Sequence, residues 1–282
     1  MFTLNCKGRL LVIDAPIVMG ILNTTPDSFY SKSRVTEIDI VLATAGKMIE
    51  DGATILDIGG QSTRPGSQRI SATEEMERVI PFIEAIRKNF PGCFISIDSF
   101  YSSVIKAAVN AGADIVNDIS AGTIDKELVA TVASLKVPYV AMHIKGDPQT
   151  MQQNAVYDNV VLDVFDFLNN QINELKNAGV NDVIIDPGFG FAKTSEHNFQ
   201  LINNLAFFKQ LGRPILVGLS RKATVYKTLG VSADEALNGT TVLNTMCVLN
   251  GASILRVHDV KEAKQLIELV QAATKKESSK AL

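Results

Sequence analysis

The sequence contains few cysteines, and their placement argues against two kinds of site. Only three occur in 282 residues, at Cys6, Cys93 and Cys247. They are odd in number, lie far apart and form no CxxC pair, so the sequence indicates neither a disulfide framework nor a structural zinc site. The first residues also lack the charged and apolar regions of a secretory signal, and we therefore expect a protein of the reducing cytoplasm.

Long apolar runs and an excess of basic residues are also missing. Hydrophobic residues make up 46% of the chain and charged residues 20%, with a formal net charge of -3. No apolar run approaches the roughly 18 residues that would span a membrane, and no basic patch typical of nucleic-acid binding is present. We therefore expect a soluble globular protein whose partners are small molecules rather than membranes or nucleic acids.

Short apolar runs alternate with amphipathic stretches along the whole chain. We expect eight strands, at residues 16–22, 53–58, 93–98, 113–118, 138–143, 182–187, 214–219 and 253–258. Helical patterns lie between them, and several end at a glycine, as helix C-termini often do. Runs that are apolar on both faces indicate a parallel sheet covered on both sides. Eight such units in about 250 residues favour a closed (β/α)₈ TIM barrel, an α/β fold, over an open doubly wound sheet.

No proline-rich linker or block of charge divides the chain. We therefore expect one domain over residues 1–282. Residues 1–14 read as a short N-terminal hairpin ahead of the first barrel strand, and residues 275–282 as a frayed tail.

The expected strands end in polar residues. Active sites of TIM barrels lie at the carboxyl ends of the strands. A single Asp or Asn after a strand usually caps the next helix, but caps have no reason to include Arg, Lys and His. A shared ligand site is indicated by the polar residues at these ends, which are Asn23, Asp57, Asp98, Asn117, Asp118, His143, Asp186, Ser220 to Lys222, Arg256 and His258.

The stretch GGQSTRPGS, residues 59–67, follows the second strand. It combines paired glycines and hydroxyls with Arg64, which Pro65 restricts to extended conformations. The stretch resembles an anion-binding flap, although it lacks the spacing of a P-loop and a plain turn remains an alternative.

Two other strand ends carry groups suited to a phosphate and its metal. Arg256 and His258 lie two residues apart, so both side chains project to the same side of an extended backbone. Arginine offers a planar fork of donors for phosphate oxygens, and histidine can add another. Asn23 offers a carbonyl oxygen of the kind that Mg²⁺ accepts. His197 lies at an apparent helix start, where a structural role is the simpler interpretation.

A second group suits a flat heterocycle. Asp98, Asn117 and Asp186 can accept hydrogen bonds from ring amino and N–H groups, while Lys222 can donate to a ring carbonyl. A carboxylate that faces two adjacent donors forms paired charge-assisted bonds. A pterin presents such an edge.

Together these stretches resemble the dihydropteroate synthase family over nearly the whole chain and in the right order. The motifs that carry the resemblance are MGILNTTPDSF, DIGGQSTRPGS, SIDS, NDIS, MHIKGDPQTMQ, DPGFGFAKT, GLSRK and LRVHDV. The resemblance implies a TIM barrel that joins 6-hydroxymethyl-7,8-dihydropterin diphosphate to p-aminobenzoate with release of pyrophosphate, and it implies Mg²⁺ as cofactor, with Asn23 as its ligand.

The resemblance also assigns roles to individual residues. The pterin would be held by Asp98, Asn117, Met142, Asp186 and Lys222, although Met142 is equally expected as core filling. The diphosphate would be held by Asn23, Arg64, Arg256 and His258. The p-aminobenzoate pocket would be lined by Phe29, Thr63, Pro65, Phe191, Ser220 and Lys222, with Phe29 on a mobile lid. The residues implied in catalysis are Asp27, Arg64, Asp98, Lys222, Arg256 and His258.

Two departures from the family pattern occur. Residues 30–35, YSKSRV, replace a glycine-containing turn, and Ala192 stands where glycine is frequent. Two other functions remain open: a pterin-binding methyltransferase barrel, which needs no diphosphate site, and a pterin-binding module without catalysis.

Residues 237–251 are apolar or small around most of a helical wheel, more than one face on a barrel requires. A helix covered by its own neighbours would explain this pattern as well as an interface would. Because relatives are commonly dimeric, we expect a homodimer.

Overall fold

The computed structural model describes residues 1–24, 34–62, 67, 69–147 and 150–274. Eight strands form one parallel sheet: β3 (Ile17–Asn23), β4 (Ile55–Gly59), β5 (Phe94–Asp98), β6 (Ile115–Asp118), β7 (Tyr139–Met142), β8 (Val183–Asp186), β9 (Leu216–Val217) and β10 (Ile254–Val257). Their spatial order is β8-β7-β6-β5-β4-β3-β10-β9. The two end strands meet at a bridge between Ile185 and Ile215, which closes the sheet into a barrel. The predicted TIM barrel is therefore confirmed.

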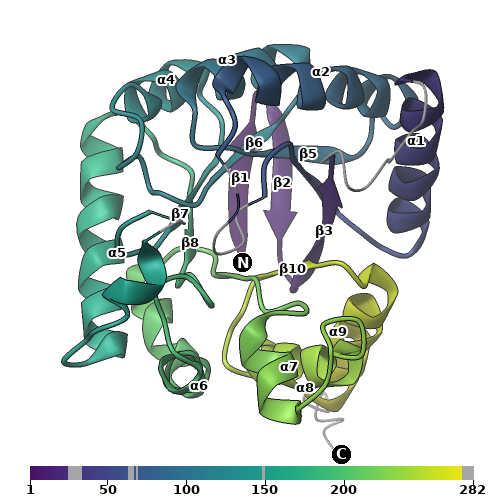
Figure 1. Ribbon diagram of the computed structural model, residues 1–282. Coiled ribbons are helices and arrows are strands. Elements are labelled where there is room, and N and C mark those ends of the chain that lie inside the picture. The colour runs from purple at the N-terminus through teal and green to yellow at the C-terminus, as the bar shows by residue number, and fades with distance from the viewer. Residues whose placement is uncertain (25–33, 63–66, 68, 148–149, 275–282) are drawn as a thin grey trace, which may run out of the picture.

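The helices surround these strands as a ring (Figure 1). They are α1 (Arg34–Glu50), α2 (Ala72–Asn89), α3 (Ser102–Ala111), α4 (Leu128–Leu135), α5 (Val160–Asn177), α6 (Ser195–Asn203), α7 (Ala223–Leu229), α8 (Leu237–Leu249) and α9 (Val260–Thr274), with 3₁₀ turns η2 (Met151–Asn154) and η3 (Leu205–Leu211). Several begin at a side-chain cap, and His197 takes part in one: its backbone N–H donates to the Thr194 hydroxyl at 3.2 Å, and its Nδ1 accepts from the Thr194 N–H. The structural interpretation of His197 is confirmed.

Both faces of the sheet are buried, as the uninterrupted apolar runs predicted. Every residue of β6, β7 and β8 is buried. Outward side chains pack with the helices in one large apolar cluster.

The interior of the barrel changes character along its axis. The half of the interior at the amino ends of the strands is apolar. It is closed by the predicted hairpin, β1 (Phe2–Cys6) and β2 (Arg9–Ile13), whose Leu4 and Leu11 pack against the barrel's inner residues. Inward side chains recur every second residue of a strand. Hence Ile55 of this layer is followed on the same side by Asp57, and Ile254 by Arg256. The carboxyl half of the interior is therefore polar.

Two sequence expectations need correction. β9 spans two residues rather than 214–219, because Ile215 makes only an isolated bridge and the chain turns after Val217. Asp118 is not part of the polar rim: its carboxylate accepts hydrogen bonds from Ser120, Gly122 and the Tyr139 hydroxyl, so its role is structural.

All three cysteines are free and buried, in agreement with the absence of a disulfide framework. The expected tail, 275–282, lies outside the described residues. Among the residues described, no helix is both long and apolar enough to cross a membrane.

Candidate active site

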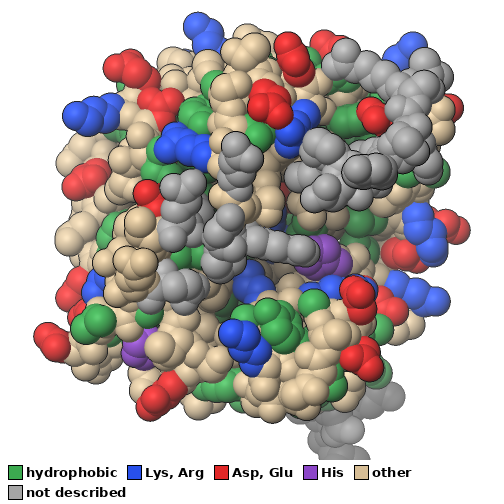
Figure 2. Space-filling model, in the orientation of Figure 1, with side chains coloured by type: hydrophobic (Ala, Val, Ile, Leu, Met, Phe, Trp, Pro, Cys, Tyr) green, Lys and Arg blue, Asp and Glu red, His purple; other side chains and the backbone are tan. Residues whose placement is uncertain are grey.

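The predicted site residues divide into two groups. Five lie outside the described part of the chain: Asp27, Phe29, Thr63, Arg64 and Pro65. The rest lie at, or in the loop after, the carboxyl end of a barrel strand: Asn23, Asp98, Asn117, Met142, Asp186, Phe191, Ser220, Lys222, Arg256 and His258. Near the middle of the face in Figure 2, Lys, Arg and His side chains reach the surface.

Arg256 joins two carboxylates inside the barrel mouth. Its Nε lies 2.6 Å from Asp57 Oδ2 and its Nη2 lies 2.6 Å from Asp98 Oδ2. Nη1 remains the guanidinium nitrogen with no partner among the described residues, and it is available to an anion.

Burial shifts the pKa values of the ionisable groups in this cluster. Burial raises the pKa of Asp98 to about 7, and the neighbouring Asp57 adds to the shift while Arg256 opposes it. For Arg256, burial acts against the charge, but Asp57 and Asp98 together raise its pKa. The guanidinium therefore stays charged, and the Asp98 carboxylate titrates close to neutrality.

The orientation of Asn117 follows from its neighbour. Its Nδ2 donates to Asp57 Oδ2 at 3.0 Å. Because Asp57 Oδ2 also accepts from Arg256 Nε, the amide presents its NH₂ group to Asp57. The amide oxygen of Asn117 is therefore turned to other donors, as a contact with pterin N–H groups requires.

Asp186 and Lys222 lie on the opposite wall, next to the loop that links β8 to α6. Asp186 Oδ1 accepts from the Gly188 N–H at 2.7 Å. Lys222 Nζ donates to the Phe189 carbonyl at 2.5 Å and lies 4.5 Å from the centre of the Phe191 ring. Burial lowers the pKa of Lys222 to about 8, although Asp186 opposes the shift, and burial raises the pKa of Asp186. Phe191 and Lys222, both predicted for the aminobenzoate pocket, are thus in contact.

Ser220 and His258 are also joined. Ser220 Oγ lies 3.0 Å from His258 Nδ1 and accepts from the His258 backbone N–H at 3.2 Å. The next residue, Arg221, binds Asp259 with two nitrogens, at 2.6 and 3.0 Å. This fork connects the end of β9 to the end of β10, so it fixes Lys222 relative to His258.

Asn23 ends β3 with an exposed side chain. The next residue, Thr24, is buried and binds the Gly59 carbonyl through both its N–H and its hydroxyl. Asn23 is therefore held at a rigid strand end while its amide faces outward, which suits a ligand of a solvated cation.

Met142 has the packing of a core residue. It is buried in a small apolar cluster that also contains Phe100, Ile144, Met151 and Ala192. The structure thus shows the core packing that was one of the two expectations for Met142, and a contact with the pterin plane remains a prediction.

Sequence reasoning counted Asp57 and Arg221 among the polar strand ends without giving either a specific role, and it did not single out Asp259. For Asp57 a signal was present, since it lies two residues after the inward Ile55 and must face the interior. No local sequence pattern indicated the ion pair of Arg221, because its partner Asp259 lies 38 residues away.

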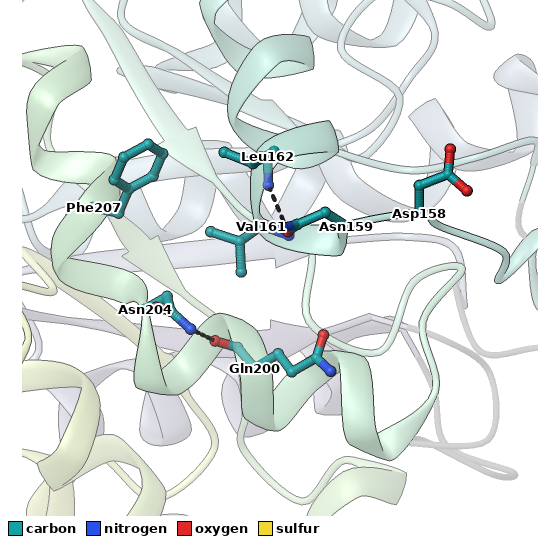
Figure 3. Close-up of a pocket in the computed structure, with 7 residues that line it drawn as sticks. All are labelled: Asp158, Asn159, Val161, Leu162, Gln200, Asn204 and Phe207. Carbon is teal, nitrogen blue, oxygen red and sulfur yellow. Dashed lines mark hydrogen bonds between the residues drawn. The ribbon is translucent and has the colours of Figure 1, made fainter.

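A pocket of about 500 Å³ lies elsewhere, among α5, α6 and η3 (Figure 3). It is lined by Asp158, Asn159, Val161, Leu162, Gln200, Asn204 and Phe207. None of these residues belongs to the barrel mouth. Asn159 already caps α5 through bonds from Val161 and Leu162.

Comparisons with known proteins agree with the geometry of the mouth. The family model of pterin binding enzymes matches residues 19–258. The dihydropteroate synthase of Haemophilus influenzae is 42% identical over 271 residues, which cover 95% of this chain and 98% of that protein.

Solved structures are similar over the whole fold. Dihydropteroate synthase from Xanthomonas albilineans with 4-aminobenzoic acid superposes with a TM-score of 0.90 at 38% identity, covering 97% of this chain and 98% of that one. A structure of the X. albilineans enzyme in complex with 7,8-dihydropteroate gives a TM-score of 0.87 at 36% identity, covering 97% and 99% of the two chains.

Proposed function

The chain belongs to the dihydropteroate synthase family of pterin-binding enzymes, and we propose that it condenses 6-hydroxymethyl-7,8-dihydropterin diphosphate with p-aminobenzoate in folate biosynthesis. The products are 7,8-dihydropteroate and pyrophosphate. The observation that carries the proposal is the barrel mouth, where acceptor oxygens of Asp98, Asn117 and Asp186 lie with two cations, Lys222 and Arg256.

Three oxygens suit the donor-rich edge of a pterin. Asp98 and Asp186 each use one carboxylate oxygen within the protein, and Asn117 uses its NH₂ group. Each residue keeps one oxygen that makes no hydrogen bond to the described residues. The pterin amino and ring N–H groups would donate to these oxygens, and Lys222 would donate to a ring acceptor. A site built of such acceptors discriminates strongly against rings without matching donors.

The diphosphate would lie against Arg256 Nη1 and His258. Asn23 fits a magnesium ion that is shared with the substrate: no group of three or more His, Cys, Asp and Glu suited to a metal exists among the described residues, so diphosphate oxygens and water would complete the shell. Bound Mg²⁺ would offset the negative charge of the leaving group. Asp27 and Arg64 keep their predicted roles here, but both lie outside the described residues.

The remaining wall suits p-aminobenzoate. Phe191 offers a ring, and Lys222 offers a cation over that ring. In the reaction the amine nitrogen forms a bond to the pterin methylene carbon while the bond from that carbon to the diphosphate oxygen breaks. The nitrogen then loses a proton, for which the released pyrophosphate or solvent is a sufficient base. The residues of the mouth therefore orient the reactants and stabilise the leaving charge rather than form a covalent intermediate.

A pterin-binding methyltransferase or a module without catalysis would need the pterin contacts alone. Arg256 argues against both, because its guanidinium lies among the pterin residues and still presents Nη1.

Direct assay tests the proposed function. The purified chain is incubated with the pterin diphosphate, p-aminobenzoate and Mg²⁺, and dihydropteroate and pyrophosphate are measured. Both products should form in equal amounts, and a chelator should stop the reaction. If no dihydropteroate forms, the proposal is wrong.

The shifted pKa values predict a narrow pH optimum. Asp98, with its pKa raised to about 7, accepts hydrogen bonds at both of its oxygens only above that pH. Lys222, with its pKa lowered to about 8, is a cation only below that pH. The profile of kcat/KM should therefore be bell-shaped, with an acid limb near 7 and a basic limb near 8. In Asp98→Asn the acid limb should disappear from whatever activity remains, and an unchanged acid limb would assign it to another group.

The outer face of α8 supports the proposed homodimer. Val242 and Leu249 lie seven residues apart on one stripe of the helix and are 51% and 60% exposed. Leu229 of α7, 53% exposed, packs over Gly239 on the same stripe. An exposed apolar surface of this kind suits a partner, and we propose that the partner is a second copy of the chain.

Sedimentation tests the dimer. The wild-type chain should sediment as a dimer at micromolar concentration, and Val242→Glu with Leu249→Glu should give a folded monomer. Leu10→Glu, at an exposed leucine of the hairpin, is the control and should remain dimeric. A wild-type monomer would contradict the prediction.

A further inference from the structure

Lys193 is a lysine without an acidic partner, buried beside the proposed site. Its Nζ lies 2.8 Å from His143 Nδ1, 3.0 Å from the Gly188 carbonyl oxygen and 3.0 Å from the Phe191 carbonyl oxygen. No carboxylate of the described residues lies within ion-pair distance of it. Only 3% of its surface is exposed. A fourth, longer contact joins Nζ to the His143 carbonyl oxygen at 3.4 Å, and burial lowers the pKa of Lys193 well below its usual range.

His143 serves as an acceptor in this arrangement. Burial lowers its pKa to about 2, and the nearby Lys193 and Lys145 add to the shift, so the imidazole is neutral. A neutral imidazole accepts at one nitrogen, and here Nδ1 faces the amine. His143 was expected at the polar rim, but its ring binds Lys193 instead.

The carbonyls that Lys193 binds belong to the loop between β8 and α6. Three residues of this loop have a left-handed backbone: Gly188 at φ 72°, Gly190 at φ 80° and Ala192 at φ 50°. Ala192 adopts this conformation despite its Cβ, which is costly for residues other than glycine. Such a loop has no regular hydrogen-bond pattern of its own, so other groups must hold its backbone.

Side chains supply these bonds. Asn198 accepts from the Gly190 N–H at 2.9 Å, and the Tyr157 hydroxyl donates to the Ala192 carbonyl at 2.9 Å. Gly188 packs closely against the residue that follows β7, since a Cβ there would lie 2.0 Å from the His143 carbonyl oxygen. The amine of Lys193 lies at this junction and binds both ends of the segment Gly188–Phe191.

The segment presents two groups to Lys222. The Phe189 carbonyl lies between the two carbonyls held by Lys193, and the Phe191 ring lies under the Lys222 ammonium. We propose that Lys193 is a positioning residue, whose amine holds this loop so that Phe191 and Lys222 form the wall of the p-aminobenzoate site. The inference rests on the proposed function for the identity of the affected substrate.

Steady-state kinetics of Lys193→Met test the role. Methionine has a similar length but donates no hydrogen bond. Phe191 O and His143 Nδ1 therefore lose the Lys193 amine, and Gly188 O keeps only the bond from the Phe191 N–H. The KM for p-aminobenzoate should rise by about tenfold or more. The KM for the pterin diphosphate should rise less, because only Asp186 and Lys222 of its ligands contact this loop. Asp98, Asn117 and Arg256 lie on other elements.

A matched control separates positioning from stability. Lys7 also donates to a backbone carbonyl, that of Val109, but it belongs to the hairpin turn at the other end of the barrel. Lys7→Met should leave both KM values unchanged. A melting temperature that falls in Lys193→Met while the KM for p-aminobenzoate stays at the wild-type value would overturn the proposal.

Hydrogen exchange gives a readout that needs no substrate. The Phe191 N–H donates to Gly188 O at 3.1 Å within the loop. Exchange at Gly190 and Phe191 should be faster in Lys193→Met than in the wild type and in Lys7→Met. Unchanged exchange would refute the role of the amine, whereas faster exchange in a chain that makes no dihydropteroate would refute only the proposed function.

Discussion

Replacement of Arg256 by Met should lower kcat/KM by about a thousandfold, because the variant loses a cation that binds both the substrate diphosphate and two carboxylates of the protein. Nη1 would no longer stabilise the charge that develops on the leaving diphosphate. In addition, Asp57 and Asp98 would face each other without their shared partner.

The loss of the partner shared by Asp57 and Asp98 affects the pterin site as well as the diphosphate site. Arg256 holds the pterin residue Asp98 at 2.6 Å, so its removal also raises the cost of keeping Asp98 ionised. Binding of a pterin without phosphates should therefore weaken as well, although less than turnover. Calorimetry with such a pterin measures this part alone.

A double variant separates stability from activity. Arg256→Met leaves two unpaired carboxylates in a buried site and should cost about 3–5 kcal/mol of folding stability. Adding Asp57→Asn removes one of these charges and should restore part of the melting temperature without restoring turnover. Recovery of turnover in the double variant would mean that Arg256 acts only through the fold.

The barrel could be predicted from sequence because its signals are local. Each strand is a short apolar run, and the polar residues begin where the run ends, as Asp98 and Asp186 do. Parallel strands bring their carboxyl ends to one rim, so residues far apart in sequence could be grouped before their contacts were known.

The contacts inside the rim could not be predicted in the same way. Arg256 reaches Asp57 across 199 positions of the chain, and no local pattern distinguishes this partner from other strand-end carboxylates. Asp118 shows the same limit, since it follows Asn117 directly but points to a structural network. Lys193 carries no sequence signal at all, because its partners are two carbonyls, which every residue has, and His143, which lies 50 positions away.

Asp186→Asn should have opposite effects on binding and on stability. Asparagine keeps the oxygen that accepts from Gly188 N–H, so the loop stays in place. Its NH₂ group, however, replaces the second oxygen and would face the pterin donors with another donor. Affinity for 6-hydroxymethylpterin should fall by about a hundredfold or more, as measured by calorimetry.

The stability of the same variant should increase. Burial raises the pKa of Asp186, so the charged form is less favourable in the folded state than in the unfolded chain, and a neutral side chain removes that cost. The melting temperature should rise by about 1–3 °C. A fall in melting temperature together with weaker pterin binding would indicate a disturbed fold rather than a lost contact.

Asp118→Asn is the matched control, because burial raises the pKa of this carboxyl too. Its two oxygens are fully used: Oδ1 accepts from Ser120, and Oδ2 accepts from Gly122 and from the Tyr139 hydroxyl at 2.7 Å each. An asparagine would turn its NH₂ group toward donors on one side and lose those bonds, so the melting temperature should fall while pterin affinity stays unchanged. If burial alone decided the outcome, both variants would be stabilised. Opposite shifts in melting temperature would therefore show that Asp186 keeps an oxygen for a ligand and that Asp118 does not.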